Sequence, residues 1–441
     1  MARYATWTGL SATTGSGGRL ALPGGLAVRA AGKPRLSDII PWRGSLLAVA
    51  ALLLAACAGT PRLPAPQTVL HAHAPVGFPA DVRQVGIDGA RTMEAYNRWL
   101  SRLPSKPSGE PLHLIAISGG GAGSAFGAGA LVGMSRAGTR PRFDLVTGIS
   151  AGALLAPFVY LGPEWDEELT EAFGGGAAQD LLRPRGPGSL FKPGIYRGEP
   201  LIELVNRFVT DRMVRAVAAE AATGRALLVA TTNLDTAESV VWDMGAIAMH
   251  GGEDARRLFR DVLVSSSSIP GVFPPVLIRV EGDGEYFDEM HVDGGTTTPF
   301  FLTPEAGLLE LQPNELLRHA QVYILINGQL GAPPTTVKVR PLPIVSRSFA
   351  TALMHSSRKS LELVAAMTDR LGLGLTLSAI PTTYPYQGAL DFSDTTMHAL
   401  FQYGLSCAES GRLWMSADEA AERGRRIASS GAIQNHDCPA N

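Results

Sequence analysis

Two short apolar segments, each followed at once by a glycine-containing turn and then by small and apolar residues, constrain this chain most. The first reads LHLIAI at residues 112–117 and leads into SGGGAGSAFGAGALVG. The second reads FDLV at residues 143–146 and leads into TGISAG and ALLAPFVY. Short apolar runs bounded by turn residues predict buried strands, and each turn connects its strand to a helix. With 441 residues, the chain is long enough for one large α/β domain with extensions.

Composition excludes several classes of protein. Apolar residues make up 45% of the chain and charged residues 18%, which permits a sizeable core. The 38 basic and 40 acidic side chains give a formal charge of −2, and no basic block stands out, so we expect no nucleic-acid partner. Three cysteines are too few for a disulfide scaffold and lack metal-ligand spacing, so we expect no metal site.

The glycine-rich turn at residues 118–133 predicts an anion site. Successive glycines let several backbone N–H groups point into one concavity, and the helix that follows adds its positive N-terminal end. A Walker loop would need Lys and Ser/Thr after its last glycine, but no basic residue occurs before Arg136. A dinucleotide motif that starts at Gly119 would need a glycine where Ser124 stands. A phosphate site is therefore disfavoured, and a developing oxyanion remains.

The second turn, Thr147-Gly148-Ile149-Ser150-Ala151-Gly152, contains the pentapeptide G-x-S-x-G. Small residues around the serine permit a strained strand-to-helix turn that exposes its hydroxyl. Because a serine hydroxyl is a weak nucleophile, it needs a base within hydrogen-bond reach. The best candidate is Asp293, which two glycines follow in the sequence HVDGG. Ser150 and Asp293 are therefore the candidate catalytic residues.

Three motifs in this order resemble the signatures of the patatin-like phospholipases. They are the three glycines at 119–121, the G-x-S-x-G turn at 148–152 and Asp293-Gly294-Gly295. The segment SSSSIPGVFPP at 265–275 also resembles the stretch that precedes the aspartate motif of that family. The resemblance covers roughly residues 112–327, about half of the chain.

The resemblance implies both a fold and a reaction. The fold is a three-layer α/β/α sandwich with a mostly parallel central sheet. The reaction is hydrolysis of acyl esters, typically of phospholipids or lysophospholipids, by a phospholipase A-type serine hydrolase without metal or organic cofactor. Ser150 would attack the ester and Asp293 would take its proton. The backbone of Gly119, Gly120 and Gly121 would form the oxyanion hole, in which the last two N–H groups hold the charge.

One departure from the family pattern concerns the substrate. Patatins have a basic residue and a glycine after the three glycines, in G-G-G-x-R/K-G. This chain has Gly123 and Ser124 at those positions. A backbone oxyanion hole is unaffected, but the loop supplies no side chain to anchor a substrate phosphate, which favours a neutral or differently charged ester.

The segment before the catalytic motifs predicts export and lipid attachment. Residues 44–56 form an apolar run after Arg43 and span about 20 Å as a helix, short of the ~30 Å of a bilayer core. The run ends in Leu54-Ala55-Ala56-Cys57, which resembles the lipobox of bacterial lipoproteins. Cleavage before Cys57 and its lipidation would anchor the protein in the bacterial cell envelope. Because Ala58 rather than aspartate follows, that family's sorting favours the outer membrane. Cys407 and Cys438 could pair after export.

We expect four regions along the chain. Residues 1–56 form an N-terminal extension and signal peptide, residues 57–108 a lipidated cysteine and proline-rich tether, residues 109–330 the patatin-like core, and residues 331–441 its C-terminal completion. Residues 174–200 are dense in glycine and proline and predict a flap or a surface loop. Further elements are expected as helices at 202–217, 346–371 and 394–404, and as strands at 226–232, 239–242 and 321–327.

Two other interpretations stay open. An α/β-hydrolase with a Ser–His–Asp triad also uses G-x-S-x-G and would draw its histidine from His319, His355 or His398. None of these has a glycine-flanked context typical of a catalytic base. A non-catalytic surface lipoprotein with the same fold is the other alternative, against which the presence of both Ser150 and Asp293 argues.

Overall fold

The computed structural model describes residues 62–66, 74–86, 89–104, 106, 110–186, 193–303, 315–331, 334–416, 419 and 438–439. The chain divides into two compact units, residues 1–58 and 59–441, and all described residues belong to the second. The apolar run at 44–56 and Cys57 lie outside the described residues. Within the described part, no helix is both long and apolar enough to cross a bilayer.

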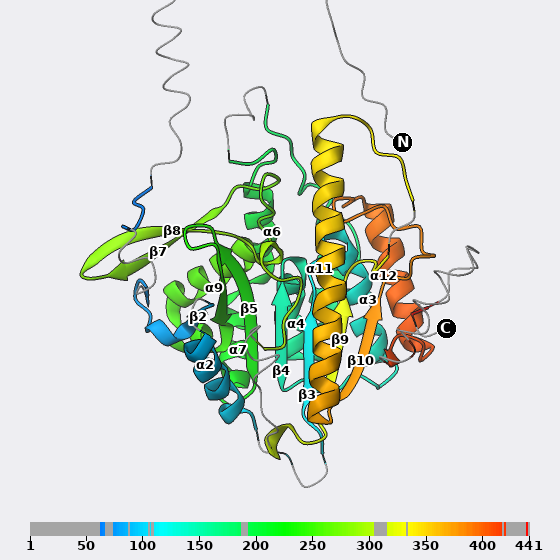
Figure 1. The fold of residues 1–441 in the computed structure, drawn as a ribbon, viewed down its shortest axis with the longest axis horizontal. Coiled ribbons are helices and arrows are strands. Elements are labelled where there is room, and N and C mark those ends of the chain that lie inside the picture. Colours follow the sequence, from blue (N-terminus) through cyan, green and yellow to red (C-terminus); the bar gives the residue numbers. More distant parts are fainter. Residues whose placement is uncertain are drawn as a thin grey trace, which may run out of the picture. The chain divides into compact units, whose positions relative to one another are not determined.

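A mixed sheet of eleven described strands forms the centre of the second unit (Figure 1). Its main order is β1-β7-β8-β5-β4-β3-β9-β10-β11, and β6 joins β5 to β2. Strands β5, β4, β3, β9 and β10 are parallel neighbours, while the flanking strands pair antiparallel. The strands are β1 (Ala74–Pro75), β2 (Arg83–Val85), β3 (His113–Ile117), β4 (Leu145–Ile149), β5 (Ala226–Asn233), β6 (Glu238–Asp243), β7 (Val276–Gly282), β8 (Glu285–Asp293), β9 (Gln321–Ile326), β10 (Gly374–Ala379) and β11 (Met415–Ser416).

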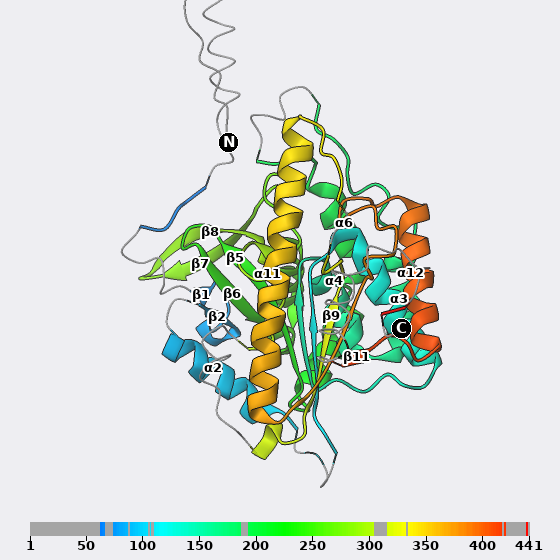
Figure 2. The same ribbon diagram turned by 45° about the vertical axis from the view of Figure 1, so that its right-hand side comes forward.

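Helices cover both faces of this sheet. Figures 1 and 2 show α11 crossing one face, with α3 and α12 on the other. Alternate residues of β3 pack into two separate cores, Ile115 and Ile117 on the side of α3 and α4, Leu114 and Ala116 on the side of α2 and α11. The helices are α2 (Gly89–Arg102), α3 (Ser124–Arg136), α4 (Ala151–Leu161), α5 (Asp166–Phe173), α6 (Glu199–Phe208), α7 (Asp211–Ala221), α8 (Met244–His250), α9 (Gly252–Ser266), α11 (Pro341–Leu371) and α12 (Asp394–Glu409). The expected α/β/α sandwich is confirmed.

The prediction of a single helix at 202–217 is wrong. The chain forms α6 and α7, and the break lies at Val209 and Thr210. The Thr210 side chain accepts a hydrogen bond from the Met213 N–H and so caps the start of α7. Val205, Val209, Met213 and Val217 are all buried in the same core, which is why their spacing continues across the break.

Part of the expected tether belongs to the sheet. Strands β1 and β2 pair with β7 and β6, and α2 packs into the core beside β3. Nearer to Cys57, the Asp288 N–H on β8 donates to the Leu63 carbonyl at 2.7 Å. The proline-rich stretch therefore does not act as a free spacer throughout residues 57–108.

The C-terminal region closes over the helical layer. Helices α3 and α12 approach closely at Gly129 and Gly404, where an added Cβ would collide with backbone carbonyls of the opposite helix. Cys407 on α12 is joined to Cys438 by a disulfide with an S–S distance of 2.03 Å, so this expected pairing is present. The bridge ties residues near the end of the chain to α12.

Candidate active site

The glycine loop and the serine turn meet at one edge of the sheet. Strands β3 and β4 are parallel neighbours, with Ile117 opposite Gly148 in the register. The residues that follow both strands therefore leave the sheet at the same edge, where binding sites of open α/β sheets form. Gly119 lies directly against the serine, because a Cβ built on it would be 2.9 Å from the Ser150 Cβ.

Ser150 occupies a strained backbone conformation between β4 and α4. Its φ is 56° and its ψ is −133°, which non-glycine residues rarely adopt and which costs about 1–3 kcal/mol. The two glycines of the motif permit the turn. A Cβ on Gly148 would lie 2.6 Å from the Gly152 carbonyl oxygen, and a Cβ on Gly152 would collide with the Ser118 carbonyl. The strained turn expected from G-x-S-x-G is present.

Two serines at the end of α9 hold the backbone of this turn. The Ser150 N–H donates to Ser266 Oγ at 2.9 Å, and the Ser266 hydroxyl donates to the Ala230 carbonyl at 2.7 Å. The Ser267 hydroxyl donates to the Ser150 carbonyl at 3.0 Å. Both belong to the SSSSIPG stretch, whose likeness to the family was noticed in the sequence but whose role was not.

The Ser150 hydroxyl donates a hydrogen bond of 2.6 Å to Asp293 Oδ2. Asp293 is the last residue of β8 and pairs with Thr231 of β5, and its other carboxylate oxygen accepts from the Gly295 N–H at 2.7 Å. Ser150 is 6% exposed and Asp293 2%. Burial raises the pKa of Asp293 to about 7, although the hydrogen bonds from Ser150 and Gly295 act in the opposite direction. The two residues singled out from the sequence are thus in contact.

The three loop glycines differ in what their N–H groups do. The Gly119 N–H donates to the Pro299 carbonyl at 3.3 Å. Among the described residues, the N–H groups of Gly120 and Gly121 have no hydrogen-bond partner. Gly120 is also partly exposed. These two N–H groups are therefore free in the described part of the chain, whereas that of Gly119 is engaged elsewhere.

Hydroxyl groups fix the orientation of both available N–H groups. The Ser118 hydroxyl donates to the Gly119 carbonyl at 2.7 Å, and the Tyr386 hydroxyl donates to the Gly120 carbonyl at 3.2 Å. In a planar trans peptide the C=O and the following N–H point in opposite directions. Holding these two carbonyls therefore aims the N–H groups of Gly120 and Gly121. Tyr386 lies in the C-terminal quarter, in which the sequence indicated no chemistry.

Asn327, directly after β9, fastens the loop from behind. Its backbone N–H donates to Ser118 Oγ and its side-chain amide donates to the Ser118 carbonyl, both at 2.9 Å. A Cβ on Gly120 would collide with the Asn327 carbonyl, so glycine is required there. Asn327 is fully buried. Sequence reasoning placed it only at the end of a strand.

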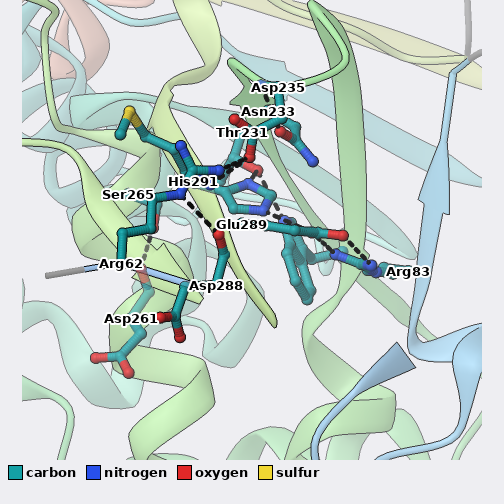
Figure 3. Close-up of polar contacts among 12 residues, drawn as sticks. Arg62, Arg83, Thr231, Asn233, Asp235, Asp261, Ser265, Asp288, Glu289 and His291 are labelled. Atoms are coloured by element: carbon teal, nitrogen blue, oxygen red, sulfur yellow. Dashed lines mark hydrogen bonds and ion pairs between the residues drawn. The ribbon is translucent and has the colours of Figure 1, made fainter. Parts of the chain in front are cut away.

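A buried polar network adjoins Asp293 on the same strand (Figure 3). Arg83 of β2 donates to both carboxylate oxygens of Glu289, at 2.5 and 3.0 Å. The Nε2 of His291 lies 3.1 Å from Glu289 Oε2, and its Nδ1 lies 2.9 Å from Thr231 Oγ1. Burial lowers the pKa of His291, against the opposing effect of Glu289. His291 is thus held as a neutral ring between Glu289 and Thr231, without contact to Ser150.

The other candidate histidines form no described hydrogen bond with Ser150. His319 follows a short 3-10 helix (Glu315–Leu317), and His355 lies exposed on α11. His398 on α12 is exposed, with Nδ1 at 3.1 Å from the Gly174 carbonyl. In the described chain, no histidine hydrogen-bonds to Ser150 Oγ. Nor does any group of three or more His, Cys, Asp and Glu side chains there have the arrangement of a metal site.

Comparison with known proteins bears on the family. Residues 115–304 match the model of the family described as patatin-like phospholipase. The protein thus carries a patatin-like phospholipase domain over these residues, as the resemblance of its motifs predicted, and the match supports lipid acyl hydrolase activity.

Two solved structures also match. VipD from Legionella pneumophila is 12% identical with a TM-score of 0.28, and the match covers 69% of this chain and 68% of that one. The type III effector protein ExoU is 15% identical with a TM-score of 0.26, and the match covers 72% of this chain and 58% of that one. No curated protein matches the chain.

Proposed function

We propose that the protein is a serine hydrolase that cleaves acyl esters of lipids, phospholipids or lysophospholipids, with Ser150 as nucleophile and Asp293 as general base. The 2.6 Å hydrogen bond between the Ser150 hydroxyl and Asp293 carries this proposal. The family match to a patatin-like phospholipase domain supports the lipid substrate.

The reaction proceeds in two steps. Ser150 Oγ attacks the ester carbonyl carbon while Asp293 Oδ2 takes the hydroxyl proton. The tetrahedral intermediate then breaks its bond to the alcohol, which leaves with the proton from Asp293. Water next attacks the acyl-serine and gives a proton to Asp293. The bond to Ser150 breaks, the serine regains a proton, and the fatty acid departs.

The environment of Asp293 suits this role. A free aspartate, with a pKa of about 3.9, is too weak a base to accept a serine proton readily. Burial raises the pKa of Asp293 to about 7, so the carboxylate gains basicity and is still ionised in a large fraction at neutral pH. No imidazole is needed between the two residues, because their oxygens are already in hydrogen-bond contact.

The oxyanion is held by the N–H groups of Gly120 and Gly121. Each such donor is typically worth about 3 kcal/mol in the transition state when its direction is set in advance. The hydroxyls of Ser118 and Tyr386 supply that preorganisation through the carbonyls of the same peptides. Gly119 takes part by leaving space beside Ser150 rather than by donating its N–H.

The proposal includes export and lipid attachment at Cys57. Residues 44–57 carry the apolar run and the lipobox-like ending, and the Cys407–Cys438 disulfide fits an oxidising compartment. The protein would then act at the bacterial cell envelope, anchored in the outer membrane. Mass spectrometry of the membrane-bound protein should find the lipid on Cys57, and an unmodified cysteine would refute this part alone.

A fluorophosphonate probe tests the proposed function, because it labels only an activated serine. The wild-type protein should be labelled at Ser150 and should hydrolyse a chromogenic acyl ester. Ser150→Ala should abolish both. Ser357→Ala is the matched control, since Ser357 is another buried serine, whose hydroxyl bonds within its own helix. Labelling at neither serine, or retained turnover in Ser150→Ala, would favour the non-catalytic interpretation or another nucleophile.

A further inference from the structure

The N-terminal end of α11 and the segment before it expose apolar and cationic side chains together. Val339 is 94% exposed, Ile344 46% and Val337 39%. Lys338 and Arg340 alternate with the two valines, and the whole set forms what we call the α11 patch (Val337, Lys338, Val339, Arg340, Ile344 and Arg347). Apolar side chains this exposed keep much of their surface in contact with water, so a group of them close together in the sequence indicates a binding surface.

The two halves of α11 differ sharply in burial. The C-terminal half packs onto the sheet through Val364, Met367 and Thr368, which are all buried. In the N-terminal half, none of the side chains described between Pro343 and Ser356 is buried. Figures 1 and 2 both show this half reaching past the ends of the central strands. The described side chains of the first half of the helix therefore contribute no buried residue to a core.

The patch lies at the start of the helix that passes close to the candidate site. Leu353, at the middle of α11, comes within 3.7 Å of where a Cβ on Gly295 would lie. Gly295 in turn donates its N–H to Asp293. From Leu353 the helix runs back toward its N-terminal end, which reaches beyond the strand ends in both views. A surface that binds the patch would thus also lie near the edge that carries Ser150.

Charge is strongly one-sided here. Residues 332–361 contain five Lys and Arg residues and no Asp or Glu, in a chain whose formal charge is −2. Among the described residues, Lys338, Arg340 and Arg347 form no ion pair. The cations of the patch therefore have no acidic partner in the described fold, which favours an anionic partner.

We propose that the α11 patch binds the surface of an anionic phospholipid bilayer. Exposed valine and isoleucine side chains would enter the headgroup region while the cations contact lipid phosphates, the composition expected of an interfacial segment. Each Lys or Arg near an anionic surface contributes about a fivefold increase in partitioning. This binding is separate from a lipid on Cys57 and does not depend on catalysis. It would present the ester-cleaving edge to a membrane.

The test uses the full chain with Cys57→Ser and Ser150→Ala, so that neither a lipid anchor nor turnover contributes. Flotation with phosphatidylcholine vesicles, with or without one quarter phosphatidylglycerol, gives the partitioning. Lys338→Glu with Arg340→Glu should lower binding to the anionic vesicles at least tenfold. Val337→Asp with Val339→Asp should lower binding to both kinds of vesicle. Residues 44–56 are common to all variants, so a difference between variants reports the altered side chains.

Matched controls separate the patch from general surface effects. Arg136→Glu with Arg215→Glu makes the same charge change at exposed sites elsewhere, and Met249→Asp with Tyr286→Asp does so for exposed apolar side chains. Both should stay within twofold of the parent. Equal losses in control and patch variants would overturn the proposal, as would unchanged binding in the patch variants. A patch-dependent dimer in light scattering would assign the surface to a second copy instead.

Failure of the proposed function can be told apart from failure here. With Ser150 restored, the patch variants should hydrolyse a soluble chromogenic ester at the parental rate, because none of the altered residues contacts Ser150 or Asp293. If that ester is not cleaved by any form of the protein but anionic vesicles are bound through the patch, the catalytic proposal fails and the membrane surface stands. If the ester is cleaved and the vesicles are ignored, the reverse holds.

Discussion

Two carboxylates on strand β8 lie four residues apart and behave in opposite ways. Asp293 and Glu289 share one face of the strand, and both are almost fully buried. Burial raises the pKa of Asp293 to about 7. Burial acts on Glu289 in the same direction, but the hydrogen bond from His291 and the Arg83 guanidinium outweigh it and hold its pKa well below the usual range.

The difference comes from cationic partners, since depth of burial is the same. Glu289 receives two hydrogen bonds from Arg83 and one from His291, so its charge is compensated. Asp293 receives only neutral donors, the Ser150 hydroxyl and the Gly295 N–H. A compensated carboxylate joins β2 to β8 and cannot act as a base near neutral pH. An uncompensated one weakens the folded state and can accept a proton.

Asp293→Asn should have the largest effect, because it keeps the shape of the side chain but removes its basicity. Turnover of a chromogenic ester should fall by roughly 10⁴-fold, while the protein stays folded. Steady-state kinetics and thermal unfolding measure the two effects. Single alanine changes at His319, His355 and His398 should retain most of the activity. If one of them proved as damaging as Ser150→Ala while Asp293→Asn stayed active, a Ser–His–Asp triad would replace the Ser–Asp pair.

Arg83→Met should lower the unfolding free energy and leave the catalytic rate unchanged. Removing the guanidinium leaves the buried Glu289 carboxylate without this cation, which typically costs about 3–5 kcal/mol of unfolding free energy. Denaturant titration measures that loss. Fluorophosphonate labelling counts the active molecules, and the rate of ester hydrolysis per labelled molecule should not change. Arg98→Met is the control, since the Arg98–Glu94 pair is exposed and worth less than about 1 kcal/mol. Adding Glu289→Met to Arg83→Met should restore much of the stability, because it removes the buried negative charge.

The sequence could predict the residues whose chemistry demands an unusual backbone. Gly119–Gly121, Ser150 and Asp293 were recognisable because a strained turn, a close approach and an aspartate with two following glycines each leave a local pattern. The order of strand, turn and helix around them predicted the local elements, whereas the layers of the fold were implied by the resemblance to a family. The contact between Ser150 and Asp293 required the resemblance to a family, since nothing local joins residues 143 positions apart.

Residues that support the site carried no such pattern. Ser266 lies 116 positions from Ser150, and Tyr386 lies 266 positions from Gly120. Their functions depend on packing that only the folded chain creates. The split between α6 and α7 was missed for a related reason. The apolar spacing continues on both sides of Thr210 because both helices pack into the same core. The capping threonine was the signal that could have shown the break.

The pH dependence of rate and that of stability should run in opposite directions through the same window. Turnover needs ionised Asp293, so kcat/KM should fall about tenfold per pH unit below the pKa of about 7. For stability, the raised pKa means that between about pH 4 and pH 7 the folded state holds a proton that the unfolded state has lost. Asp293 therefore contributes stability at low pH, and this is lost as pH rises through 7, by on the order of 4 kcal/mol.

Unfolding free energies of the parent and of Asp293→Asn, measured at pH 5 and pH 8, isolate the contribution of Asp293 protonation to stability. The asparagine variant should be relatively more stable at pH 8 than at pH 5, because it lacks the uncompensated charge. The pKa of Glu289 is lowered, so its contribution to stability has the opposite sign and is lost in acid. Because Glu289 is present in both proteins, this contribution does not distinguish them. Parallel curves for the two proteins would show that Asp293 titrates at an ordinary pKa in the folded state.

Tyr386→Phe should have the smallest effect on turnover. It extends the comparison from the two carboxylates to the oxyanion, which is the other charge of the reaction. That charge is held by the N–H groups of Gly120 and Gly121 without a cation, so only their direction matters. Losing the hydroxyl that holds the Gly120 carbonyl should lower kcat about five- to tenfold, below the roughly 10²-fold of a lost donor. KM and the midpoint of the pH profile should not move, because Asp293 is untouched.

Tyr323→Phe, whose hydroxyl faces His113, should leave kcat unchanged. A lower melting temperature with unchanged kcat would make Tyr386 a packing residue. A shifted pH midpoint would mean that it acts through Asp293 after all.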